Sequence, residues 1–143
     1  MDYGEYEECL ELMLQTYGLG SEHQLVERSL RPFGTSHDGR DINGYVIHQS
    51  GTSWIFENRE AIIIDCGIHA REWMSPAFCR LFMHELLRCN VQNAQMPADC
   101  HPESADLLKF NWYFIPIANP DGYSYTWTGS QVEPAAFRSG KFI

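Results

Sequence analysis

A short β-branched run, followed at once by a polar loop and an amphipathic helix, constrains this chain more than any other feature. Residues 61–64 are a continuous apolar run, which predicts a strand buried on both faces. The loop 65–73 follows, and Ser75 and Pro76 then predict a helix start, with Ser75 as N-cap and Pro76 in the first turn. The apolar stripe of that helix is formed by Phe78, Leu81, Phe82 and Leu86. Strand, loop and helix in this order indicate a layered α/β fold.

The remaining elements fit the same fold class. The pattern predicts a helix over residues 6–17 that ends at Gly18 and Gly20. A strand over 25–33, a turn at Asp38 and Gly39 and a returning strand over 44–49 would follow. Further predicted segments are a short helix over 103–109, a strand over 110–118 that contains Pro116, and a turn at 119–122.

Length and charge exclude several classes of protein. A chain of 143 residues suffices for one domain. Its net charge of −9 argues against nucleic acid as a partner, because such binding rests on basic side chains. No apolar stretch approaches the roughly 20 residues that a membrane span needs, so no membrane partner is expected. The acidic N-terminus does not read as a signal peptide, so the chain is either cytosolic or lacks its natural beginning.

His69 and Glu72 are the candidate metal ligands. They lie just beyond a predicted buried strand, where open α/β sheets commonly bind ligands. Imidazole and carboxylate both suit Zn²⁺, but a catalytic zinc takes three protein ligands, and nothing later in the chain clearly supplies the third. The alternative is a surface histidine beside a carboxylate that stabilises a helix start. Weaker candidates, which we do not expect to bind metal, are His23, His37, His48, His84 and His101.

The cysteines leave their pairing open. Five is an odd number, so at least one is unpaired within the chain. Buried, unpaired cysteines are one interpretation, and a disulfide that closes the short loop from Cys66 to Cys79 is another. The full set is Cys9, Cys66, Cys79, Cys89 and Cys100.

Three segments resemble one enzyme family. Residues 65–79 closely resemble the zinc metallocarboxypeptidases of the carboxypeptidase A/B type. Residues 115–128 form a second match, and residues 34–42 look like the family's early hairpin. The order and spacing agree over roughly residues 3–130. The resemblance implies an α/β fold, a mixed β-sheet with flanking helices, of which this chain would hold an incomplete part.

The resemblance also implies residue roles. His69 and Glu72 match the first two zinc ligands. Arg71 matches an arginine that contacts the peptide substrate; without the resemblance, an exposed arginine paired with a neighbouring carboxylate would be preferred. Cys66 and Cys79 match a disulfide found in many members, which implies an oxidising compartment. Members are typically secreted, usually with a pro-segment ahead of the enzyme.

The chain departs from the family after Ser130. We expect residues 1–130 to be the N-terminal part of a carboxypeptidase domain and 131–143 to be a divergent tail. In the family, a third zinc-ligating histidine, a general-base glutamate, substrate-gripping arginines and a tyrosine come later. None has a counterpart here. The sheet would then end on an unpaired apolar edge.

Two functions are therefore expected. The first is a zinc exopeptidase that releases C-terminal residues from peptides and proteins, with this chain inactive alone and a monomer. The second is a non-catalytic short form that binds zinc or peptide weakly.

Overall fold

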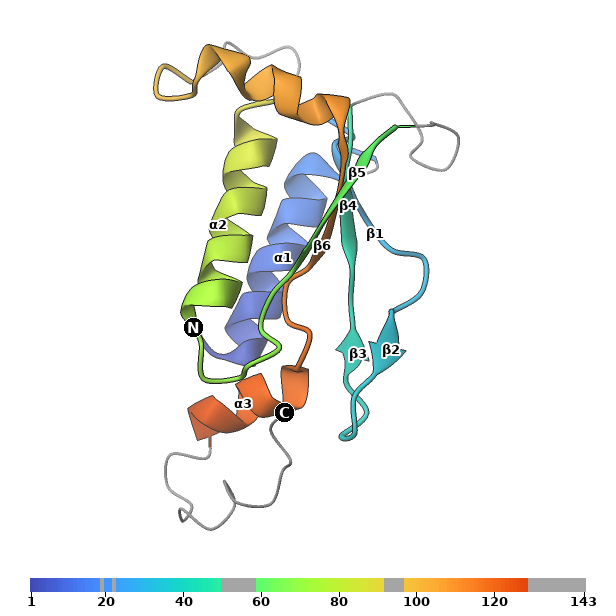
Figure 1. Ribbon diagram of the computed structural model, residues 1–143, viewed down its shortest axis with the longest axis vertical. Helices are drawn as coiled ribbons and strands as arrows, with labels where there is room; N and C mark the ends of the chain where they lie inside the picture. Colours follow the sequence, from blue (N-terminus) through green and yellow to red (C-terminus); the bar gives the residue numbers. More distant parts are fainter. Residues whose placement is uncertain (19, 22, 50–58, 92–96, 129–143) are drawn as a thin grey trace.

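The computed structural model describes residues 1–18, 20–21, 23–49, 59–91 and 97–128, which form one layer of sheet and one layer of helices (Figure 1). The strands are β1 (Val26–Arg28), β2 (Gly34–Thr35), β3 (Asp41–Ile42), β4 (Tyr45–Ile47), β5 (Ala61–Asp65) and β6 (Asn111–Ile115). The helices are α1 (Tyr3–Tyr17), α2 (Met74–Arg88), α3 (Pro120–Thr128) and the 3₁₀ helix η2 (Pro102–Lys109).

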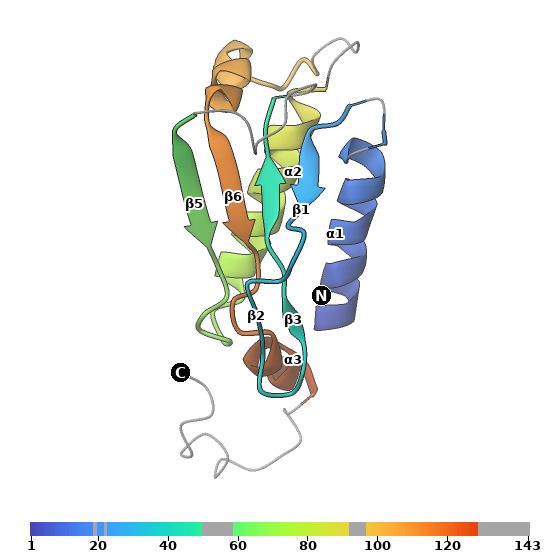
Figure 2. The ribbon, with the colours of Figure 1, turned by 90° about the vertical axis from the view of Figure 1, so that its right-hand side faces the viewer.

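The main sheet has the strand order β1-β4-β6-β5. The pairs β1–β4 and β4–β6 are antiparallel, whereas β5 and β6 run parallel, with Asp65 opposite Ile115 at their carboxyl ends. Helices α1 and α2 lie on the same face of this sheet (Figure 2). The predicted fold class, a mixed sheet with flanking helices, is therefore confirmed.

The core lies between this sheet face and the two helices. The side chains of Leu10, Met83 and Phe114 are at most 1% exposed and come from α1, α2 and β6 in turn. The Tyr6 hydroxyl donates a hydrogen bond to the Pro76 carbonyl oxygen at 2.8 Å, which joins the start of α2 to α1. The disulfide Cys89–Cys100 links the end of α2 to the segment before η2. This pairing was not predicted from the sequence.

Residues 61–64 lie in the strand β5, as predicted. The prediction that both faces of this strand are buried is wrong, because Ile63 is 70% exposed. Within the described part of the chain, β5 pairs only with β6, and the face of the sheet opposite α1 and α2 carries no helix. A continuous apolar run shows that both faces of a strand are apolar, but it does not show what covers them.

The predicted stripe of α2 is also only partly correct. Phe78 and Leu81 are 55% and 54% exposed, and the buried face is formed by Pro76, Cys79, Met83, Leu86 and Leu87. Apolar residues occupy more than one side of this helix, so periodicity alone could not identify the side that meets the sheet.

The turn predicted at Asp38 and Gly39 is confirmed. Gly39 has φ +82° in the tight connection between β2 and β3, a conformation that favours glycine. The strand predicted over 110–118 is shorter in the structure: β6 ends at Ile115, and Pro116 lies just past it, so the missing N–H of Pro116 removes no hydrogen bond from the sheet. No helix in the described ranges is long and apolar enough to cross a membrane.

Candidate metal centre

The loop that carries His69 and Glu72 begins where the parallel strands β5 and β6 end together. Backbone hydrogen bonds hold this loop to the segment after β6: the Cys66 N–H donates to the Ile115 oxygen at 2.9 Å, and the Ala118 N–H donates to the Cys66 oxygen at 2.8 Å. Figure 1 shows the loop and α3 at the same end of the sheet. The two family-like segments, far apart in the sequence, are therefore in direct contact.

Gly67 makes this close approach possible. Its φ is +69°, and a Cβ placed there would lie 3.1 Å from Pro76 Cγ and 3.2 Å from the Ile117 Cα. The Gly67 N–H donates to the Ser75 hydroxyl oxygen at 3.3 Å. The prediction that Ser75 caps α2 is wrong: the helix begins at Met74, and the Ser75 side chain is used to hold the loop instead.

A turn brings His69 and Glu72 near each other. The Glu72 N–H donates to the His69 oxygen at 3.0 Å, and the Ser75 N–H donates to the Glu72 oxygen at 3.0 Å. The first bond closes a four-residue turn, so the two residues are separated by less than about 7 Å between Cα atoms. His69, Glu72 and the intervening Arg71 are all exposed.

Helix α3 supports the inner side of this turn. Ala70 is 5% exposed, and a Cβ on Gly122 would lie 2.8 Å from the Ala70 Cβ and 2.7 Å from Asn119 Nδ2. The Asn119 side chain donates to the Ile68 oxygen at 3.2 Å and accepts from the Gly122 N–H at 2.9 Å. A glycine at position 122 is thus what allows α3 to sit against the turn.

The far end of the loop is fixed by aromatic stacking. The ring of Trp73 lies on that of Trp127 with 4.3 Å between centroids and 12° between planes. The Trp73 indole N–H also donates to the Thr126 hydroxyl at 3.0 Å. Loop 66–73 is therefore held at both ends and in its middle by the chain between residues 115 and 127.

Asp121 anchors the β2–β3 hairpin to α3. Its carboxylate accepts from the Ser36 hydroxyl at 2.7 Å, from the Asp38 N–H at 2.9 Å and from the Arg40 guanidinium. Burial acts to raise the pKa of Asp121, but these hydrogen bonds outweigh it and hold that pKa below its ordinary value.

Cys66 and Cys79 are both buried and are free thiols here, so the predicted disulfide is not formed in this structure. They are nonetheless in hydrogen-bonding contact, which lowers the pKa of Cys66 to about 6 and, together with burial, raises that of Cys79. The contact places the two sulfurs next to each other without a bond, and the pairing stays a prediction.

The residues present fit part of a zinc site. An imidazole and a carboxylate are good Zn²⁺ donors, and both are exposed on an anchored loop. Among the described residues, no group of three or more histidine, cysteine, aspartate or glutamate side chains is placed to hold a metal ion. In this part of the chain, then, His69 and Glu72 have no third partner of those types.

His69 and Glu72 stay predicted ligands, and the residues that support their turn were not predicted from the sequence. Residues 119–122 were predicted as a turn, whereas Pro120 begins the helix α3. Proline is common in a first helical turn, and this was the available signal. Nothing in the sequence indicated that Gly122 abuts Ala70 or that Trp127 stacks on Trp73.

The chain is similar in sequence to known proteins of one family. The sequence model of the family described as zinc carboxypeptidase matches residues 24–138. Human carboxypeptidase B is 40% identical over 108 residues, which cover 75% of this chain and 22% of that protein. Bovine carboxypeptidase B is 34% identical over 131 residues, which cover 91% of this chain and 28% of that protein.

The fold gives the same result. A crystal structure of thrombin-activatable fibrinolysis inhibitor matches with a TM-score of 0.69 and 29% sequence identity, over 88% of this chain and 27% of that one. The chain belongs to the zinc carboxypeptidase family. It spans about a quarter of the length of these relatives. The predicted boundary at residue 130 stays a prediction, since the tail 131–143 lies outside the described residues.

Proposed function

We propose that this chain carries two zinc ligands, His69 and Glu72, of a metallocarboxypeptidase that releases C-terminal residues from peptides and proteins. The observation that carries the proposal is the His69–Glu72 turn, which lies at the carboxyl end of β5 and is held by the segment after β6. Membership of a zinc carboxypeptidase family supports zinc as the metal.

Each residue of the turn has a chemical task in this proposal. The His69 imidazole and the Glu72 carboxylate hold the metal, which when bound polarises the scissile carbonyl and activates a water molecule. The Arg71 guanidinium is exposed between them. It would bind a peptide oxygen and so orient the substrate beside the metal.

The 143-residue chain alone is proposed to be inactive. Two ligands do not fix a zinc geometry, and the described residues offer no third. Family resemblance places the third histidine, the general-base glutamate and the substrate-gripping arginines later in the sequence. Without the base and the arginines, little would accept the water proton or stabilise transition-state charge.

The second candidate function is weak binding of zinc or of a peptide without catalysis. The exposure of His69, Arg71 and Glu72, with no third ligand in the described ranges, favours this reading for the isolated chain. The two candidate functions predict different results for a longer protein that contains this segment: the first predicts peptidase activity, and the second predicts binding without catalysis.

An extracellular location is also part of the proposal. The Cys89–Cys100 disulfide supports it, because such bonds persist in oxidising compartments. A longer enzyme that contains this segment is proposed to act as a monomer, with peptide C-termini as its substrate.

The experiment is a peptidase assay on two proteins: the pure 143-residue chain, and the same residues joined to the region that follows the match in human carboxypeptidase B. We expect no turnover of peptides ending in arginine or phenylalanine by the short chain. The chimera should show zinc-dependent release of the last residue that His69→Ala abolishes and His37→Ala leaves unchanged. Turnover by the short chain, or an active His69→Ala chimera, would refute the assignment.

A further inference from the structure

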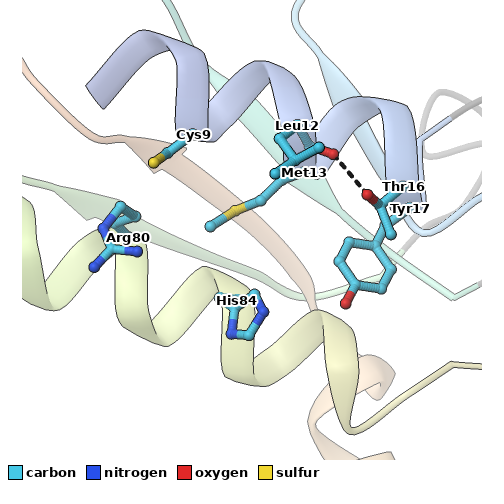
Figure 3. Close-up of a pocket in the computed structure, with 7 residues that line it drawn as sticks. All are labelled: Cys9, Leu12, Met13, Thr16, Tyr17, Arg80 and His84. Carbon is cyan, nitrogen blue, oxygen red and sulfur yellow. Dashed lines mark hydrogen bonds between the residues drawn. The ribbon is translucent and has the colours of Figure 1, made fainter. Parts of the chain in front are cut away.

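A hollow lies between α1 and α2, away from the candidate metal centre (Figure 3). Its volume is about 240 Å³, below the roughly 300 Å³ where drug-sized sites begin. A ligand there would have to be small. The residues that define it are Cys9, Leu12, Met13 and Tyr17 from α1 and Arg80 and His84 from α2.

The helix α1 supplies an apolar wall. Met13 is 6% exposed, and Figure 3 shows its side chain reaching toward α2 between Arg80 and His84. The Tyr17 ring lies at the other end of the same wall. The only hydroxyl of the wall besides that of Tyr17 belongs to Thr16, and it already donates to the Leu12 oxygen at 2.8 Å. An occupant would therefore meet mostly carbon and sulfur on this side.

The helix α2 supplies the polar groups. Arg80 and His84 are four residues apart, so they lie on the same side of the helix. His84 Nδ1 lies 3.5 Å from the Glu85 carboxylate, which engages one ring nitrogen. Arg80 is half-buried and forms no hydrogen bond or ion pair with any other residue in the described ranges. Its guanidinium thus keeps all five N–H donors available.

The charge at the hollow is opposite to that of the chain. The protein has a net charge of −9, yet no carboxylate is among the described residues that line this space. The Arg80 nitrogens are not among the buried side-chain atoms that lack a partner in the described ranges, so water reaches them. An anion that accepts from Arg80 would replace this water with a charge-assisted hydrogen bond.

We propose that the hollow between α1 and α2 binds a small organic carboxylate, whose apolar chain packs on Met13 and Tyr17 and whose carboxylate accepts hydrogen bonds from Arg80. A planar guanidinium suits a carboxylate, which it can bind with two parallel hydrogen bonds. An inorganic anion would use Arg80 but leave the apolar wall uncovered. A neutral apolar molecule would leave Arg80 unpaired.

Cys9 provides a direct readout of occupancy. Its thiol is only partly buried and points toward Arg80 in Figure 3. A bound ligand would shield it from a neutral maleimide, and peptide mass spectrometry separates this cysteine from the buried Cys66 and Cys79.

The experiment measures the rate of Cys9 alkylation in the full chain against the concentration of hexanoate, with hexanamide and acetate as matched probes. We expect hexanoate to slow alkylation several-fold, and hexanamide and acetate to do so far more weakly. Arg80→Gln should raise the hexanoate concentration for half-protection by about tenfold, the loss expected for one charge-assisted hydrogen bond. Arg31→Gln, which removes a charge outside the hollow, should not change it.

Three results would overturn the site: no protection at millimolar hexanoate, equal protection by hexanamide, or half-protection unchanged in Arg80→Gln. If Arg80→Gln does not fold, as judged by circular dichroism, Arg80→Lys replaces it, because an ammonium group keeps the charge but cannot form two parallel hydrogen bonds to a carboxylate. Half-protection in Arg80→Lys must then shift to higher hexanoate for the site to stand, and an unchanged value overturns it.

Discussion

At the scale of single residues, the candidate metal centre depends on two glycines, which carry no side chain, as much as on its possible ligands. A Cβ on Gly122 would lie 2.8 Å from the Ala70 Cβ, too close to fit without a shift, and a Cβ on Gly67 would lie 3.1 Å from Pro76 Cγ at a φ of +69° that strains other residues. The two possible ligands, in contrast, are exposed and make few contacts that would fix them. The position of the turn is therefore set mainly by its backbone and by what packs underneath.

Gly122→Ala should displace the metal-binding turn. Its new methyl group would meet the Ala70 Cβ at 2.8 Å, and overpacking of this kind typically costs about 1–3 kcal/mol. We expect that loss of unfolding free energy in urea, together with faster proteolysis in loop 66–73. Gly34→Ala is the control, because its Cβ would lie 3.9 Å from Ile42 Cδ1, an ordinary contact. Equal stability of the two variants would contradict the tight packing described here.

The hydrogen bonds of Asp121 predict how the unfolding free energy depends on pH. Its pKa is lower in the folded protein than the roughly 3.9 of an unfolded chain, so its hydrogen bonds stabilise the fold above that value. This stabilisation should be lost as the pH falls through the folded-state pKa. The difference in unfolding free energy between wild type and Asp121→Asn should therefore be largest near neutral pH and shrink below about pH 4. Asp106→Asn, at an exposed surface pair with Lys109, should show little effect at any pH.

At the scale of elements, much of the fold could be predicted from the sequence. Residues 61–64 form β5, the Asp38–Gly39 turn lies in a hairpin, and residues 111–115 form β6, because each depends on local periodicity or turn chemistry. The helix α3 was missed because its start at Pro120 resembles a turn. The burial of β5 and α2 was misjudged because it depends on which other elements cover them, and no local pattern encodes that.

Cys66 and Cys79 join the metal-binding loop to α2, so the bond predicted between them belongs to the scale of elements. In an oxidising glutathione buffer we expect these two thiols to form the disulfide that the family resemblance implies, aided by the lowered pKa of Cys66, about 6. Closing this short loop would add about 3 kcal/mol to the unfolding free energy in the chain-entropy model. Peptide mapping should find the 66–79 pair and leave Cys9 unpaired. A Cys9 disulfide in its place would contradict the arrangement seen here.

At the scale of the whole molecule, the described residues cover one face of the sheet with α1 and α2 and leave the other face open. On the open face, Val46, Tyr113 and Ile63 stand in one row across β4, β6 and β5. With Phe33, which is 62% exposed, they line a mostly apolar hollow of about 490 Å³. Exposed apolar surface favours association, and so does the edge of β5, which in the described part of the chain pairs only with β6.

The isolated chain should therefore bind a hydrophobic dye and self-associate as its concentration rises. Ile63→Lys, which places a charge on the open face, should reduce both, while Leu30→Lys should not, although Leu30 is 88% exposed. Sedimentation velocity and dye fluorescence measure the two effects. A wild-type chain that stays monomeric and does not bind dye would show that this face is covered in solution.

The most direct test of the central claim, that His69 and Glu72 are zinc ligands, is a zinc titration of the full chain against a competing chromophoric chelator. We predict one weak site, well below the affinity of a three-ligand centre, that His69→Ala and Glu72→Ala each weaken by at least about tenfold. His37→Ala should bind as the wild type does. Zinc binding that is unchanged in both His69→Ala and Glu72→Ala would contradict the account.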